Sequence, residues 1–244
     1  MAKVRLDQLL VARGLADSRA RARDAVLRGH VTVSGRAVDK PGLAVDDASE
    51  VAITDPASAY VSRAALKLIS GLDHFGFDVT GKDCLDVGAS TGGFTQVLLE
   101  RGAARVVALD VGHGQLHARI AGDSRVTNLE GLNARELTAD DLPYLPEVIV
   151  SDVSFISLTL ALPPALVLAR RPALGLFLVK PQFEAGKDAI GKGGIVDEAT
   201  GHAAALRIRD WFDGRDGWRV HDLIASPILG GDGNHEYLLG ASRD

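Results

Sequence analysis

The chain has 244 residues, of which 46% are hydrophobic, a net charge of −5 and one cysteine. This length and apolar content are those of a globular protein with a sizeable core, and one cysteine excludes an intramolecular disulfide. The longest apolar stretch, residues 158–169, contains Pro163 and Pro164 and is too short to span a bilayer. The N-terminal residues carry no apolar signal segment, so we expect a cytoplasmic protein without stable membrane association.

The charge is unevenly distributed along the chain. Residues 1–45 contain nine basic and four acidic side chains, a surplus of five positive charges. With −5 overall, residues 46–244 must therefore sum to −10. A basic segment joined to an acidic body suggests a polyanionic partner, although a solvated, charged helix face would have the same composition.

The first 55 residues are expected to form a small α+β domain. Apolar side chains at helical spacing run from Leu6 to Val11, and Gly14 ends this first predicted helix. Ser18 is a suitable N-cap for a second, arginine-rich helix, which Gly29 ends. Short strands are expected at residues 31–33, 37–38 and 51–53, and a linker at residues 56–61.

Residues 62–244 are expected to form a second, α/β domain. Helices are predicted at residues 61–75 and 94–101, and strands at residues 84–87, 106–110, 126–129, 147–152, 175–180, 220–225 and 236–239. Alternating strands and helices of this kind predict a doubly wound, Rossmann-like sheet. In such sheets the ligand lies beyond the carboxyl ends of the strands.

A glycine-rich turn, Gly88–Gly93, follows the strand that contains Asp86. It is not the GxGxxG dinucleotide pattern, because Ser90 occupies the position of the second glycine, and no lysine follows to make a P-loop. Amides of such a turn can bind a carboxylate, Asp86 can attract an ammonium, and Asp110 ends the next strand, where ribose hydroxyls are bound. These groups together fit S-adenosylmethionine; a plain turn with two capping aspartates is the alternative.

Four charged residues are expected at the rim of the same sheet: Lys67, Asp152, Lys180 and Glu236. Each alone would more often be a solvated charge. Together they suit methylation of a ribose 2′-hydroxyl, because a lysine that lies beside a second cation and partly out of water loses its proton more readily, and acids can orient it. Methylation of a base carbon generally needs a nucleophilic cysteine instead, and Cys84 lies inside a predicted strand.

The N-terminal segment resembles the RNA-binding domain of ribosomal protein S-four. The resemblance rests on Arg5-Leu6-Asp7, Gly14-Leu15-Ala16, Ser18-Arg19, Gly29-His30-Val31-Thr32-Val33 and Val38-Asp39-Lys40-Pro41-Gly42. Arginines on a helix beside a tight hairpin can contact successive phosphates of folded RNA. The RNA-binding residues expected here are Arg5, Arg19, Arg21, Arg23, Arg28 and Lys40. A small packing domain without a ligand is the alternative.

Nearly the whole chain resembles the TlyA family, which joins an S-four-type domain to an FtsJ-like methyltransferase domain. The motifs concerned are Asp86-Val87-Gly88-Ala89-Ser90-Thr91-Gly92-Gly93-Phe94, Ser151-Asp152-Val153-Ser154-Phe155, Lys180-Pro181-Gln182-Phe183-Glu184 and Gly233-Asn234-His235-Glu236-Tyr237. The resemblance implies cytidine 2′-O-methylation of ribosomal RNA, with Lys67, Asp152, Lys180 and Glu236 as the catalytic set. It implies an S-adenosylmethionine site at Asp86, Gly88, Ala89, Ser90, Thr91, Gly92, Gly93, Phe94, Asp110, Val111, Asn133 and Asp152, and no metal.

Members of the family have shorter and longer forms, and the longer ones also modify small-subunit RNA. This chain is similar to the shorter form, which favours large-subunit RNA or the subunit itself as the partner, and we expect a monomer. Two alternatives are a membrane-active protein, because the family has also been called a haemolysin, and a ribosome-assembly factor that binds RNA without catalysis. Residues 185–200 are glycine-rich and are expected to form a loop beside Lys180, which either closes on the substrate or is passive.

Overall fold

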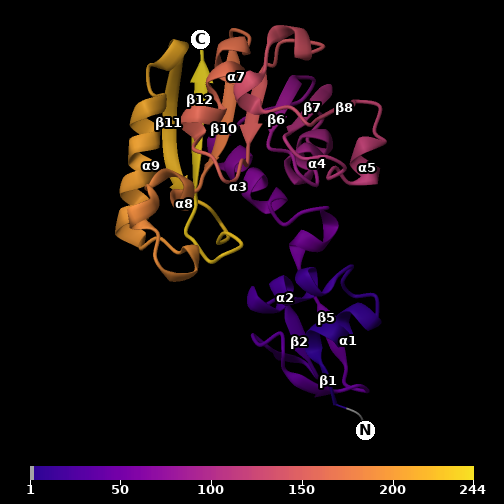
Figure 1. Ribbon diagram of the computed structural model, residues 1–244. Coiled ribbons are helices and arrows are strands. Elements are labelled where there is room, and N and C mark those ends of the chain that lie inside the picture. The colour runs from indigo at the N-terminus through magenta and orange to yellow at the C-terminus, as the bar shows by residue number, and fades with distance from the viewer. Residues whose placement is uncertain (1–2) are drawn as a thin grey trace. The chain divides into compact units, whose positions relative to one another are not determined.

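The computed structural model describes residues 3–244 and contains two compact units, one that ends at Ala59 and one from Tyr60 to Asp244 (Figure 1). We call them the head and the large unit. The segment expected to be a linker begins with a turn of 3-10 helix, Pro56–Ala59, whose backbone is held by the Asp55 carboxylate through the amide of Ala57 at 2.9 Å. The head therefore continues in ordered structure up to the division between the units.

From residue 3 onward, the head contains two α-helices and five short strands. In chain order they are β1 (Lys3–Arg5), α1 (Leu6–Ala12), α2 (Arg19–Leu27), β2 (Val31–Val33), β3 (Arg36–Ala37), β4 (Ala44–Asp46) and β5 (Val51–Ile53). Ser18 caps α2 by accepting a hydrogen bond from the amide of Arg21 at 3.3 Å. The strands form a β3-β2-β5 sheet and a separate β1-β4 pair. Strands β1 and β4 were not predicted, because Lys3–Arg5 and Ala44–Asp46 each have only one large apolar residue, valine, between their ends.

The large unit is built around one sheet of seven strands. Its elements are α3 (Ala65–Phe75), β6 (Asp83–Val87), α4 (Gly93–Glu100), β7 (Arg105–Asp110), α5 (Ala118–Ala121), β8 (Val126–Glu130), β9 (Val148–Ser151), α6 (Leu158–Ala161), α7 (Pro163–Leu168), β10 (Ala173–Val179), α8 (Pro181–Glu184), α9 (Glu198–Phe212), β11 (Trp218–Ala225) and β12 (Tyr237–Arg243). The strand order is β11-β12-β10-β9-β6-β7-β8. Strands β6 to β10 run parallel, and β12 is antiparallel to both of its neighbours.

Helices cover both faces of this sheet, as the doubly wound prediction requires. Along β6, Cys84 packs with the α3 and α4 side, while Leu85 packs with the side of α6, α7 and α9. Both side chains are 0% exposed. Strands buried on both faces are therefore mostly apolar, with exceptions such as Asp86 in β6, which is why they appear in the sequence as nearly continuous runs.

One prediction for the large unit needs correction, and several of its helices were not predicted. Helix α3 starts at Ala65 rather than at Val61, because residues 61–64 form a turn. The apolar stretch 158–169 forms two short helices, α6 and α7, with Pro163 as the first residue of the second. Helix α9 was not predicted; its buried positions are Gly201, Ala204, Ala205, Ile208 and Phe212, and the first three are small residues that mark an apolar stripe only weakly.

The last strand ends in a buried arginine that caps a helix. Arg243 donates hydrogen bonds to the carbonyl oxygens of Leu166, Val167 and Ala169 at 2.8–3.1 Å, at the end of α7. Only 7% of Arg243 is exposed. Carbonyl groups at a helix end have no partner within the helix, so a buried cation is an effective way to satisfy them.

We expect Arg243→Ala to lower the free energy of unfolding by about 2–4 kcal/mol, because it leaves several buried carbonyl groups without a donor. Urea unfolding would measure the change. Arg219→Ala is a matched control on the neighbouring strand, because the Arg219–Asp244 pair has side chains that are 74% and 77% exposed. An exposed pair contributes less than about 1 kcal/mol. Equal losses in the two variants would contradict the capping role.

Candidate active site

Four strand ends converge at one edge of the sheet. The parallel strands β6, β7, β9 and β10 all present their carboxyl ends there. The antiparallel β12 begins at the same edge, because Val179 at the end of β10 pairs with Tyr237 at its start. Lys180 and Glu236 therefore flank the same pair of strand ends, each one residue beyond the paired residues.

The glycine-rich turn after β6 is tightly packed against the loop after β9. Gly88 has φ +84°, and a Cβ there would lie 2.9 Å from the Val153 side chain and 3.0 Å from its backbone. Ser90, two residues after Gly88, also has a positive φ, of 47°, although it is not glycine. The backbone of this turn is thus held in a conformation that a side chain at residue 88 would prevent.

Asp110 fixes the turn after β6 and the turn after β7 at once. Its carboxylate accepts hydrogen bonds from the amide of Ser90 and from the amide of Gly112, both at 2.8 Å. Beside it, the carboxylate of Glu130 at the end of β8 accepts from the amides of Gly114, Gln115 and Leu116 at 2.7–3.0 Å. These amide bonds, that of Leu116 first, lower the pKa of Glu130. Glu130 was missed, although its place at the end of a strand matches that of Asp110.

Asp86 is a fully buried acid with one unpaired oxygen. The hydroxyl of Thr95 donates to its Oδ2 at 2.7 Å, whereas Oδ1 has no hydrogen-bond partner among residues 3–244. Burial raises the pKa of Asp86 to about 7, and the neighbouring charges of Asp152 and Asp110 act in the same direction. A buried carboxylate oxygen without a donor is costly, so this site is suited to a cationic ligand group.

The four predicted rim residues form two ion pairs. Lys67 Nζ lies 2.5 Å from Glu236 Oε2, and the side chains are 6% and 2% exposed. Lys180 Nζ lies 2.6 Å from Asp152 Oδ1, and these side chains are 11% and 17% exposed. This second contact is ionic and lacks hydrogen-bond geometry; Lys180 instead donates to the hydroxyl of Ser154 at 2.7 Å. Ser154 is an additional member of the site, which the sequence did not single out.

Gly230 and Glu184 shape the loops that carry these ion pairs. A Cβ on Gly230 would lie 2.5 Å from Glu236 Oε1, so the close approach of this carboxylate needs a glycine. Glu184, after Lys180, accepts from the hydroxyl of Ser157 at 2.5 Å and the amide of Leu158 at 2.8 Å, and burial raises its pKa. Glu184 thereby connects the segment after β10 to the segment after β9.

The predicted loop 185–200 is partly helical. It contains two turns of 3-10 helix, Lys187–Ala189 and Lys192–Gly194, and α9 begins within it at Glu198. Asn234, 1% exposed, holds its far end by accepting from the amide of Val196 and donating to the carbonyl of Gly194, both at 2.9 Å. The loop is thus attached through Asn234 to the segment that carries Glu236, two residues later.

Other residues predicted to bind the cofactor lie in different environments. Phe94 is 3% exposed and packs in the apolar core beside α3, so its side chain is part of that core. Val111 is 68% exposed next to Asp110. Asn133 accepts from the amide of Arg135 at 3.1 Å and caps a short turn. Cys84 is 0% exposed, consistent with its expected place in the core.

Phe155 is an exposed aromatic ring at the rim. It follows Ser154, the hydroxyl partner of Lys180, and is 90% exposed with φ +65°. Its ring centroid lies 5.2 Å from that of Phe183. On the α9 side of the rim, a cavity of about 490 Å³ is lined by residues including His202, Glu236 and Tyr237. Space and an aromatic surface thus adjoin the charged pairs.

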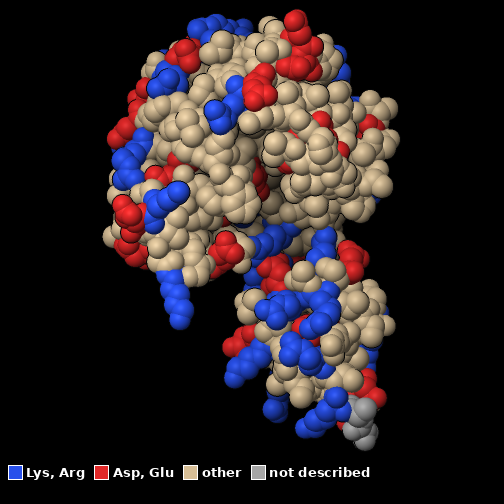
Figure 2. All heavy atoms as spheres, viewed as in Figure 1, with Lys and Arg blue, Asp and Glu red and all other residues tan. Residues whose placement is uncertain are grey.

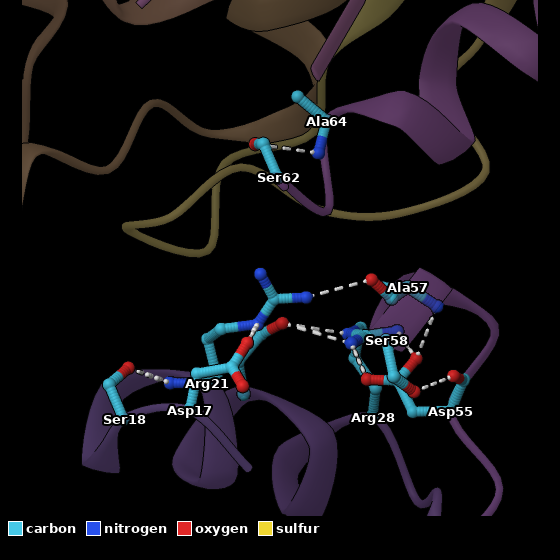
Figure 3. Close-up of polar contacts among 10 residues, drawn as sticks. Asp17, Ser18, Arg21, Arg28, Asp55, Ala57, Ser58, Ser62 and Ala64 are labelled. Atoms are coloured by element: carbon cyan, nitrogen blue, oxygen red, sulfur yellow. Dashed lines mark hydrogen bonds and ion pairs between the residues drawn. The ribbon is translucent and has the colours of Figure 1, made fainter. Parts of the chain in front are cut away.

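The predicted RNA-binding residues of the head fall into two groups. Arg5 and Arg19 are 45% and 55% exposed and share the buried carboxylate of Asp7. Arg28, in contrast, is only 13% exposed and bonds Asp24 and Asp55. Figure 3 shows Arg28 bound to Asp55. It also shows Arg21, whose Nη2 donates to the carbonyl oxygen of Ala57 at 3.0 Å. Arg23 and Lys40 are exposed. Arg28 is therefore an internal ion-pair partner, which its place on a basic helix did not reveal.

Basic side chains are nevertheless abundant on the surface of the head, as the space-filling view in Figure 2 shows. No helix in the described part of the chain is long and apolar enough to cross a membrane. Among the same residues, no cluster of histidine, cysteine, aspartate or glutamate could hold a metal ion.

Comparison with known proteins gives matches over both units. The FtsJ-like methyltransferase family matches residues 60–243, and the S4 domain family matches residues 4–51. The 16S/23S rRNA (cytidine-2′-O)-methyltransferase TlyA of Mycobacterium tuberculosis is 44% identical over 97% of this chain and 89% of its own length. Hemolysin A of Brachyspira hyodysenteriae is 39% identical over 96% of this chain and 98% of its own. A solved structure of a "Putative hemolysin" from Streptococcus thermophilus, 40% identical, has a TM-score of 0.76 and covers 100% of this chain and 89% of its own.

Lys67→Met should lower the free energy of unfolding by about 3–5 kcal/mol, because it leaves the buried Glu236 carboxylate without its partner. The double variant Lys67→Met/Glu236→Leu removes both charges and should recover most of this loss. Urea unfolding of the three proteins would measure both effects. Arg101→Met serves as the control, because its pair with Asp73 is 43% and 55% exposed and should contribute less than about 1 kcal/mol. A double variant as unstable as the single one would show that burial of an unpaired charge is not the cause.

Proposed function

This chain belongs to the TlyA family, and we propose that it transfers a methyl group from S-adenosylmethionine to the ribose 2′-hydroxyl of a cytidine in ribosomal RNA. The observation that carries the proposal is the arrangement of Lys180 with Asp152 and Lys67 with Glu236 at the edge where the glycine-rich turn lies. The match to the FtsJ-like methyltransferase family over residues 60–243 supports the reaction class. The names of the relatives support the substrate class.

The residues at the turn fit the cofactor. When bound, S-adenosylmethionine supplies a methyl group on a sulfonium and carries an ammonium, a carboxylate and a ribose. The unpaired, buried Oδ1 of Asp86 would receive the ammonium, and Asp110 would receive ribose hydroxyls. Amides of the turn from Gly88 to Gly93 would bind the carboxylate. Val111, exposed beside Asp110, offers apolar surface to the base of the cofactor.

Lys180 is the base in this proposal. Its Nζ would accept the proton of the 2′-hydroxyl as the hydroxyl oxygen takes the methyl group. S-adenosylmethionine would supply that methyl group, and the C–S bond would break with its electron pair left on the sulfur. The Asp152 carboxylate, 2.6 Å from Nζ, stabilises the ammonium that this proton transfer produces, and Ser154 keeps Nζ in place. The buried Lys67–Glu236 pair supplies a second, fixed cation and anion at the rim. A hydroxyl is a weak nucleophile, so removal of its proton is the step for which such groups are needed.

The exposed Phe155 ring of the large unit and the exposed arginines of the head are each available to an RNA substrate. Unstacked bases of RNA are commonly held on aromatic rings, and the arginines of the head can neutralise phosphates. Large-subunit RNA, a cytoplasmic location and a monomeric state remain predictions. Assays on RNA from each subunit, with label in the methyl group of the cofactor, would identify the substrate and the ribose position modified.

We expect Lys180→Ala to lower the rate of methyl transfer by at least about 100-fold, because a general base contributes on the order of 10²–10⁴. Cofactor affinity, measured by calorimetry, should stay within a few-fold of that of the unaltered protein. If the variant instead lost cofactor binding, Lys180 would be structural. If the unaltered protein bound RNA but methylated none, a non-catalytic assembly factor would be favoured, whereas leakage of liposomes without RNA would favour the membrane-active alternative.

Cofactor affinity should rise with pH up to about 7, by at most about tenfold per pH unit. The pKa of Asp86 is raised to about 7, so below this pH the acid is neutral and cannot pair with an ammonium. Thr95→Val removes a hydrogen bond that lowers the pKa of Asp86, and should therefore move the midpoint to higher pH. Calorimetric titrations between pH 5.5 and 8 would show this. An unchanged midpoint in the Thr95 variant would exclude Asp86 as the titrating group.

A further inference from the structure

We propose that Asp7 is a positioning residue for RNA recognition, which holds Arg5 and Arg19 as one preformed clamp for phosphates. The inference rests on the proposed function, because it assumes that the head binds RNA. It assigns a role to a buried acid inside the most basic part of the chain, where an acid weakens the attraction to a polyanion unless it serves another purpose.

The geometry is that of one carboxylate shared by two guanidinium groups. Arg5 donates from Nε to Oδ1 at 3.1 Å and from Nη2 to Oδ2 at 3.0 Å, and Arg19 donates from Nη2 to Oδ2 at 3.2 Å. Arg5 precedes α1 and Arg19 begins α2, so the carboxylate joins the starts of the two helices. Asp7 itself is 0% exposed. The hydrogen bond from Arg5, more than any other contact, lowers its pKa, so the carboxylate is charged at neutral pH.

Both arginines remain available to a ligand. Their side chains are 45% and 55% exposed, although Arg5 is bound to Asp7 through Nε and Nη2 and Arg19 through Nη2. A guanidinium has five N–H donors, so each arginine has donors left for phosphate oxygens. The carboxylate reduces repulsion between the two cations and restricts their rotamers before RNA arrives. Less conformational entropy is then lost on binding, which is the general benefit of preorganisation.

The loop before β4 also constrains this pair. The amide of Asp7 donates to the carbonyl of Pro41 at 3.0 Å. A Cβ on the next residue, Gly42, would lie 3.0 Å from Nη1 of Arg5. The loop therefore passes directly beside the guanidinium and limits its movement, and it carries the exposed Lys40.

The head contains a second arginine–aspartate pair, Arg28 with Asp55, in which the arginine is largely buried. Arg28 bonds Asp55 through both terminal nitrogens, at 2.9 and 2.5 Å, and bonds Asp24 through Nε at 3.1 Å. The side chains of Arg28 and Asp55 are 13% and 7% exposed. This pair connects α2 to the segment after β5 and faces the interior. Disrupting it should therefore affect the stability of the head and not its contact with phosphates.

Asp7→Asn tests the inference in the full-length protein with unmodified large-subunit ribosomal RNA. RNA affinity should fall at least about tenfold. The slope of the logarithm of the RNA association constant against log [salt] should become shallower by about one, which corresponds to the loss of about one phosphate contact. Asp55→Asn should lower the melting temperature of the protein by as much as Asp7→Asn does. It should nevertheless change RNA affinity by less than about twofold. Cofactor affinity of the large unit should be unchanged in both variants.

The same experiment includes an epistasis test that a merely structural role would not satisfy. In an Arg5→Ala/Arg19→Ala background, Asp7→Asn should have no further effect on RNA affinity. If Asp7→Asn does not fold, Arg19→Lys keeps the charge but not the planar donors, and should weaken binding several-fold, whereas Arg36→Lys on β3 should not. Unaltered RNA affinity in Asp7→Asn, or an equal loss in Asp55→Asn, would overturn the inference. Failure of the unaltered protein to bind RNA would instead overturn the proposed function.

Discussion

The candidate active site depends on one inverted strand. Because β12 runs antiparallel between β10 and β11, its first residue pairs with the last residue of β10, and Glu236 reaches the edge where the parallel strands end. A parallel strand in this place would put its first residues at the opposite edge of the sheet. The buried contact between Glu236 and Lys67 joins this strand to α3, so the register of β12 and the chemistry of the rim are set together.

The charges in the large unit are arranged in order of burial. Asp86 is fully buried and partly neutral near pH 7, the Lys67–Glu236 pair is buried but paired, and the Lys180–Asp152 pair is the most accessible of the three. A cofactor that carries its own positive charges would compensate the first group, and a substrate hydroxyl could reach the last. Part of the negative charge of the large unit thus lies at the candidate active site.

Much of this site could be predicted from the sequence, for identifiable reasons. Residues next to strand ends, such as Asp110, Lys180 and Glu236, were found because apolar runs mark strand ends well. The role of Gly230 could not be found, because the sequence does not show that the carboxylate of Glu236 turns back toward it. Arg28 was placed with the RNA-binding residues because charge does not reveal whether a side chain points inward. Helix α9 was missed because the first half of its buried face, Gly201 to Ala205, is made of small residues, and only Ile208 and Phe212 add large apolar side chains.

The single cysteine gives the protein a built-in reporter of its central sheet. Cys84 lies in β6 between two neighbouring strands and is fully buried, and burial raises the pKa of its thiol. A thiol reagent can therefore modify it only when the middle of the sheet opens, so the modification rate follows the rarest opening events of the large unit. It also follows that a cysteine introduced on the surface of the head could carry a spectroscopic label selectively, without removal of the native one.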